Sequence, residues 1–173
     1  MMKTFAITAI FSLAAAFVPL NAQTVEIALL EDAGDLGAKA NRASESIISG
    51  VLDGLFDAGL IGTNSRPLDG TAASFLSYVP GVASADGFVD YVIVVFAEYS
   101  NAAPVPACRY RLVRVRDGRE MAQGTIPAVD PASTSIVDID KACHKLGLAV
   151  SAACGGVVRG VNASRRKYGY EKA

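Results

Sequence analysis

The sequence has few of the residues from which catalytic centres are built. Its 173 residues include one histidine, His144, three cysteines and no tryptophan. The Gly-x-Ser-x-Gly motif that carries the nucleophile of many hydrolases is missing, and so is the Gly-Lys-Ser/Thr ending of a phosphate-binding loop. Cys143 and His144 are neighbours, and neighbouring helical residues point about 100° apart, so the two do not form a nucleophile–base pair. We therefore expect no catalytic residue, no metal site and no cofactor.

The sequence also lacks an excess of charge of one sign. Its 16 lysines and arginines are balanced by 17 aspartates and glutamates. Nucleic-acid binding needs a basic surface, so we expect no nucleic-acid partner. The basic cluster Arg165–Lys167 near the C-terminus is typical of a solvated tail.

A membrane-spanning hydrophobic run is the third missing feature. The apolar run Phe5–Val18 is shorter than the roughly 20 residues that a transmembrane helix needs. Lys3 precedes it and Pro19–Ala22 follows it, a pattern typical of a secretory signal peptide. We predict a signal peptide at residues 1–22 and a single domain at residues 23–173 with no transmembrane segment, located in the periplasm or secreted.

The three cysteines leave two interpretations. Cys143 and Cys154 are predicted on one helix, where eleven residues span roughly 16 Å, beyond the reach of a disulfide. Only Cys108 could therefore pair with one of them, as an exported protein permits. The favoured alternative is that all three are small buried apolar residues.

The fold can be predicted outward from Val92–Ala97, six apolar residues in a row. A half-exposed strand alternates apolar and polar residues, whereas an unbroken β-branched run is typical of a strand covered by helices on both faces. Gly87 before this run and Asn101–Pro104 after it leave too little room for a helix. We therefore predict a buried strand in the middle of a sheet.

The remaining segments predict the order β-α-β-α-β-β-β-α. The expected strands are at 24–30, 60–66, 88–99, 107–116 and 119–127, and the expected helices at 38–58, 71–79 and 135–163. The first helix carries two apolar rows that we expect to pack on the sheet: Ala43, Ile47, Val51 and Leu55, and then Ile48, Leu52 and Phe56. Right-handed crossovers give an α/β (α+β) fold with a single mixed five-stranded sheet, order 2-1-3-4-5, and helices on both faces.

Three short patterns resemble a known group of domains. They are VEIALLED at Val25–Asp32, a helix that ends in Gly59-Leu60 before a short strand, and the hairpin LVRVRDGREMAQGTI at Leu112–Ile126. In these features the chain resembles the α/β domain of the TolB N-terminal domain, CsgG and LpoB, from about Val25 to Val161. The resemblance implies an envelope accessory domain that contacts other proteins without catalysis. The chain differs in lacking a lipidation cysteine and a propeller or pore-forming segment.

Acidic residues follow the first and third predicted strands. Open α/β sheets bind ligands at the carboxyl ends of the two strands beside the switch point, and here these are the first and third strands. We expect one crevice that favours a basic peptide, an amine or a divalent ion; the alternative is a solvated rim that binds nothing. The candidate ligand- or partner-binding residues are Glu31, Asp32, Asp35, Glu98 and Tyr99.

These observations favour one function and leave a second open. The first is an exported non-catalytic domain for protein–protein interaction in cell-envelope assembly or maintenance, with envelope proteins as partners. The alternative is a periplasmic small-ligand or cation-binding protein that uses the acidic crevice. An enzyme ranks third, because no nucleophile, base and metal-ligand set converges in the sequence.

We predict that the mature domain folds without a disulfide. Replacing Cys108, Cys143 and Cys154 by alanine should lower the free energy of unfolding by only a few kcal/mol of lost packing. Thermal unfolding of the wild type, followed by circular dichroism, should give the same Tm with and without dithiothreitol. Unfolding by reductant alone would contradict this prediction.

Overall fold

The structure is a computed structural model that describes residues 23–32, 38–80, 88–100 and 103–169. The predicted signal peptide at residues 1–22 and the candidate residue Asp35 lie outside the described residues. Within the described ranges, no helix is both long enough and apolar enough to cross a membrane.

One mixed six-stranded sheet forms the framework, with the path β2-β1-β4-β5-β6. The strands are β1 (Thr24–Asp32), β2 (Ile61–Asn64), β3 (Leu68–Asp69), β4 (Tyr91–Ser100), β5 (Ala103–Arg114) and β6 (Arg119–Ile126). β1 pairs in parallel with β2, β3 and β4, and the β4–β5 and β5–β6 pairs are antiparallel. The predicted order 2-1-3-4-5 is confirmed, and the two-residue strand β3 is added to it.

The predicted central strand is buried on both faces. No residue of Tyr91–Ala97 exceeds 2% exposure. Since successive side chains on a strand point to opposite faces, Ile93 and Val95 enter the larger core and Val92 and Val94 the smaller one. The sheet therefore has two hydrophobic cores that share β4.

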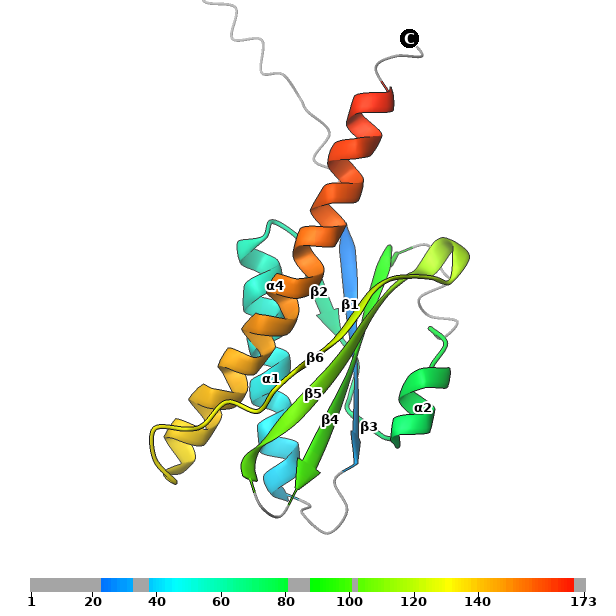
Figure 1. The fold of residues 1–173 in the computed structure, drawn as a ribbon. Coiled ribbons are helices and arrows are strands. Elements are labelled where there is room, and N and C mark those ends of the chain that lie inside the picture. Colours follow the sequence, from blue (N-terminus) through cyan, green and yellow to red (C-terminus); the bar gives the residue numbers. More distant parts are fainter. Residues whose placement is uncertain (1–22, 33–37, 81–87, 101–102, 170–173) are drawn as a thin grey trace, which may run out of the picture.

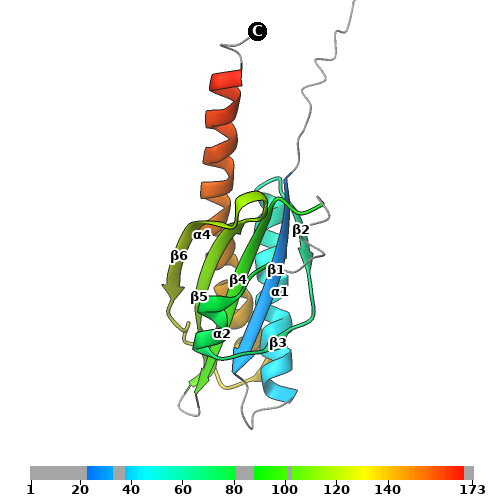
Figure 2. The same ribbon diagram turned by 90° about the vertical axis from the view of Figure 1, so that its right-hand side faces the viewer.

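Helices cover both faces, as predicted (Figures 1 and 2). α1 (Ala38–Asp57) and α4 (Ile136–Gly169) lie over the larger core, and the short α2 (Ala72–Ser77) lies over the smaller one. Thr71 begins α2 with a capping box. Arg111 of β5 fixes the other end, because its Nη1 donates to the carbonyl oxygens of Phe75 and Leu76 at 2.8 and 2.9 Å.

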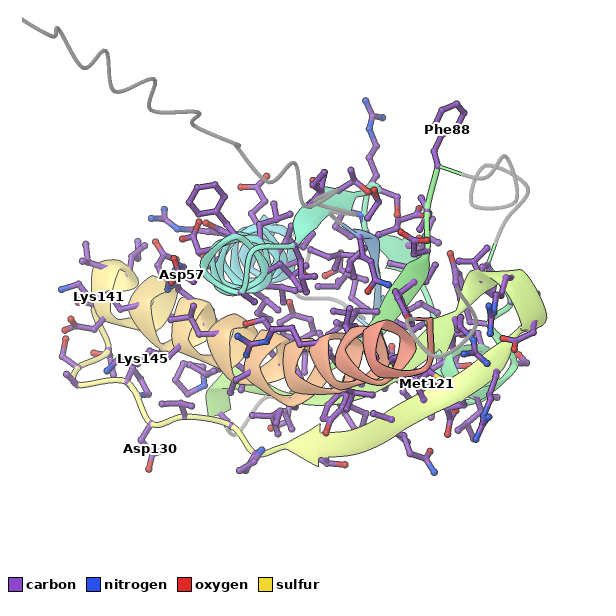
Figure 3. All side chains as sticks on the ribbon, turned by 90° about the horizontal axis from the view of Figure 1, so that it is seen from above. Asp57, Phe88, Met121, Asp130, Lys141 and Lys145 are labelled. Atoms are coloured by element: carbon purple, nitrogen blue, oxygen red, sulfur yellow. The ribbon has the colours of Figure 1, made fainter. Side chains whose placement is uncertain are left out.

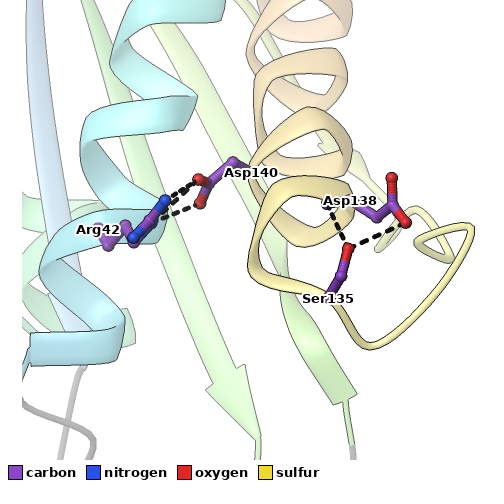
Figure 4. A network of polar contacts seen from close by, with 4 residues as sticks. All are labelled: Arg42, Ser135, Asp138 and Asp140. Carbon is purple, nitrogen blue, oxygen red and sulfur yellow. Dashed lines mark hydrogen bonds and ion pairs between the residues drawn. The ribbon is translucent and has the colours of Figure 1, made fainter.

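α1 and α4 run side by side in the same direction and meet along small residues (Figure 1). A Cβ added at Gly50 would lie 2.1 Å from the backbone oxygen of His144, and one added at Gly147 would lie 2.1 Å from that of Ile47. The two backbones can therefore approach this closely only because both positions lack a side chain. Near the start of α4, Arg42 Nε donates to Asp140 Oδ2 at 2.9 Å across the two helices (Figure 4).

The prediction of buried apolar helix faces is wrong for two residues. Phe56 was expected to pack on the sheet but is 80% exposed. At about 100° per residue, Phe56 lies about 140° around the helix axis from the fully buried Val51, outside the face that contacts the sheet. Ile136 begins the three- and four-residue apolar spacing of the last helix, which predicts that it packs on the sheet, but it is the first residue of α4 and is exposed.

We predict that Gly50→Ala destabilises the domain. The added methyl group must push α1 and α4 apart, and overpacking of this kind costs about 1–3 kcal/mol. Gly156→Ala is the matched control, because nothing lies within 4 Å of a Cβ added there and alanine favours a helix by up to about 1 kcal/mol over glycine. Urea unfolding should give a lower midpoint for Gly50→Ala and an equal or higher one for Gly156→Ala. Equal midpoints for the two variants would contradict the close contact.

Candidate functional site

The first candidate site is the carboxyl end of β1 and β4. The two strands are neighbours, as predicted, with Glu31 opposite Ala97 and Asp32 opposite Glu98. The described candidate residues are therefore close in the sheet. Whether they bind a ligand or partner stays a prediction.

The side chains at this end are divided between the two faces of the sheet. Glu31 and Tyr99 point toward α1, where Glu31 is only 5% exposed. Asp32 and Glu98 occupy the alternate positions, are exposed, and lie on the α2 side. Glu98 Oε2 is 3.7 Å from Nη2 of Arg109, whose guanidinium lies over the Phe96 ring. Across the described residues, no group of three or more His, Cys, Asp or Glu side chains is placed to hold a metal ion.

A buried chain of hydrogen bonds connects Glu31 to Tyr99 through Ser44 of α1. The Ser44 hydroxyl donates to Glu31 Oε2, and its oxygen lies 2.8 Å from the Tyr99 hydroxyl. A serine hydroxyl has one hydrogen to donate, so Tyr99 donates to Ser44. Burial raises the pKa of Tyr99, which keeps the phenol protonated. Glu31 and Tyr99 thus tie the sheet to α1.

The three thiols are poor nucleophiles in this structure. Cys108, Cys143 and Cys154 are free, buried and part of the larger core, which confirms that they are buried among apolar residues. Burial raises the pKa of Cys143 to about 11 and that of Cys154 to about 12. Since the thiolate is the reactive form, these groups favour a packing role.

His144 lies on the outer side of the two large helices. It is partly exposed, and its Nε2 is 2.9 Å from Asp53 Oδ2 on α1. His144 borders a shallow hollow of about 580 Å³ between α1 and α4, which Lys141 and Lys145 also line. Figure 3 labels both lysines on the first, yellow turns of α4, at the left of the view. His144 is thus a partly exposed surface residue, as expected of a lone histidine without catalytic partners, and its hydrogen-bond partner Asp53 was not indicated by the sequence.

A second hollow, with a volume of about 610 Å³, lies between the end of α1 and β2. Phe56 and Ile61 are the most exposed apolar side chains that border it, at 80% and 50%. Its lining residues are Leu52, Asp53, Phe56, Gly59, Leu60, Ile61 and Gly62. β2 is the edge strand of the sheet on this side (Figure 2). We call this region the β2-edge surface.

The β2-edge surface was not predicted from the sequence. Phe56 was assigned to the core because it continues an i,i+4 row from Ile48 and Leu52. Two signals could have identified it. One is the pair of steps of about 40° from Ile48 through Leu52 to Phe56, and the other is the Gly59 turn that brings β2 back beside α1. Gly59 has a φ of 72°, which allows that tight turn.

Comparisons with known proteins show likeness in fold. No protein-family model matches the chain, and no curated protein matches its sequence. TolB from Acinetobacter baumannii has a TM-score of 0.47 and 15% identity over 80% of this chain and 29% of TolB. PelC from Paraburkholderia phytofirmans, solved as a dodecamer, has a TM-score of 0.42 and 14% identity over 75% of this chain and 84% of PelC. Lipoprotein GNA1162 from Neisseria meningitidis has a TM-score of 0.47 and 16% identity over 82% of this chain and 99% of that one.

This chain therefore spans less than a third of the TolB chain. TolB is also one of the proteins that the sequence patterns resemble. At these identities and TM-scores, membership of that group stays a prediction.

We predict that Ser44→Ala destabilises the domain, because it leaves the buried Glu31 carboxylate and the Tyr99 hydroxyl without their link. A buried polar group that loses its partner costs about 1–3 kcal/mol. Ser49→Ala is the matched control, since Ser49 is an exposed serine on the same helix. Urea midpoints should fall for Ser44→Ala and stay within error for Ser49→Ala. A Ser44→Ala midpoint equal to that of the wild type would show that the hydrogen-bond chain contributes no stability.

Proposed function

We propose that this protein is an exported, non-catalytic domain that binds other proteins of the cell envelope and serves envelope assembly or maintenance. The observation that carries the proposal is the exposure of Phe56 and Ile61 around an apolar hollow beside an open strand. Exposed apolar patches with a polar rim are typical of interaction sites, and aromatic side chains are enriched at the centres of interfaces.

The chemistry of the other groups supports the same proposal. The buried polar groups of the candidate site serve structural contacts, since Glu31, Ser44 and Tyr99 join β1, α1 and β4. The thiols are buried, and their raised pKa values disfavour the thiolate. The signal peptide pattern supports export.

Binding of a small ligand or cation at the carboxyl end of β1 and β4 is the second candidate. Asp32 and Glu98 favour it, because they are exposed and directly opposite in register. Arg109, however, partly neutralises Glu98 from 3.7 Å, and Glu31 lies on the other face. This end is therefore less suited to a cation than the sequence alone indicates.

Photo-crosslinking in the source cells tests the proposal. We expect a crosslinking amino acid at position 56 to give discrete products of higher mass with an envelope protein, because that side chain lies at the centre of the proposed surface. The same amino acid at Arg159, an exposed residue of α4, is the control and should give none. Position 98 is the comparison for the second candidate: products from position 98 and none from position 56 would move the site to the β1–β4 end. The absence of products from both positions would contradict a protein-binding function at either surface.

A further inference from the structure

β2 has backbone hydrogen-bonding groups on its outer side with which no described strand pairs. The amide of Ile61 donates to the Gln23 carbonyl at 3.0 Å, and that of Ser65 to the Ile27 carbonyl at 3.2 Å. Alternate residues of a strand direct their N–H and C=O groups to opposite sides, so those of Gly62 and Asn64 point away from β1. In the described part of the chain, no strand pairs with β2 on that outer side.

The side chains around this edge border the hollow on the α1 face. Gly62 faces α1 so closely that an added Cβ would lie 2.7 Å from Leu52 Cδ2. Strands of a sheet lie about 4.8 Å apart, so a strand added outside β2 would bring alternate side chains over the hollow bordered by Leu52 and Phe56. An apolar side chain there would cover the exposed ring of Phe56.

The charges around the edge are mostly negative. Asp53 and Asp57 flank Phe56 on α1 and are exposed, and Figure 3 shows Asp57 on that helix. On the other face, Glu26 lies beside Thr63 in register. Arg66 lies just after β2 and is basic, and Asp53 also contacts His144 Nε2 at 2.9 Å. Two copies of this chain paired through β2 would bring two such acidic groups together, whereas a basic segment would be attracted.

We infer that β2 receives an extended basic segment of a partner protein by strand addition. The inference rests on the function proposed above and names the partner's chemistry: an extended stretch with apolar side chains on the α1 face and lysine or arginine alongside. Backbone hydrogen bonds to Gly62 and Asn64 hold the segment, and the hollow selects its apolar side chain. This is the recognition mode in which a peptide extends an exposed sheet edge.

The test uses capped seven-residue peptides and the mature chain, residues 23–173. The first peptide alternates valine and lysine, and the matched control alternates valine and glutamate. We expect the lysine peptide to bind at least tenfold more tightly, with the largest NMR shift changes at the Gly62 and Asn64 amides. The double variant Asp53→Asn, Asp57→Asn should weaken this binding and its salt dependence, while Asp130→Asn, an exposed control, should change neither.

Backbone methylation separates strand addition from other contacts. Two further lysine peptides carry N-methyl groups on either the valine or the lysine amides. In an extended peptide the valine amides point to one side and the lysine amides to the other, so only one of these two sets points toward β2. Only the peptide methylated on that set should lose tenfold or more in affinity. Equal affinities for the two methylated peptides, shifts centred on β6 or on the β1–β4 end, or dimerisation of the chain through β2 would overturn the inference. If position 56 still crosslinks to a partner in that case, the proposed function stands and only strand addition is lost.

Discussion

The backbone contact between α1 and α4 is the constraint on which the rest of the structure depends. Gly50 and Gly147 let the two helices pack side by side as one layer over the sheet. That layer covers one face of β4, and the three cysteines are buried between the helices and the sheet. It also fixes the rotation of α1, so that Val51 faces inward and Phe56 is left at the margin. The exposed hollow beside β2 is thus a consequence of how the two helices pack.

The same alternation that builds the two cores divides the acidic residues. Glu31 and Tyr99 fall on the α1 face, where burial requires that they be hydrogen-bonded, and Ser44 provides that bond. Asp32 and Glu98 fall on the opposite face and stay in solvent. The carboxyl end of β1 and β4 therefore has buried, hydrogen-bonded side chains on one face and exposed carboxylates on the other. The exposed apolar surface lies elsewhere, at the edge strand β2.

Much of the fold could be predicted from the sequence, because the unbroken apolar run of β4 and the right-handed crossovers allow few sheet orders. The same two features also predict that β1 and β4 are adjacent in the sheet. The face of each carboxylate follows from the alternation of side chains along β1 and β4, but this alternation does not show which face α1 and α4 cover. The exposure of Phe56 depends on the rotation of α1, which the steps of about 40° along its row indicate but do not fix. That rotation is set by a tertiary contact at Gly50 and Gly147, which the apolar pattern of α1 alone does not show.

The most direct test of the account is amide hydrogen exchange of the domain, alone and in complex with the partner that crosslinks from position 56. The account predicts that binding slows exchange at Gly62 and Asn64, whose amides point outward. Ile61 and Ser65 should change little, because their amides already donate to β1. Protection that appears instead at β6 or at the β1–β4 end, with Gly62 and Asn64 unchanged, would contradict the account.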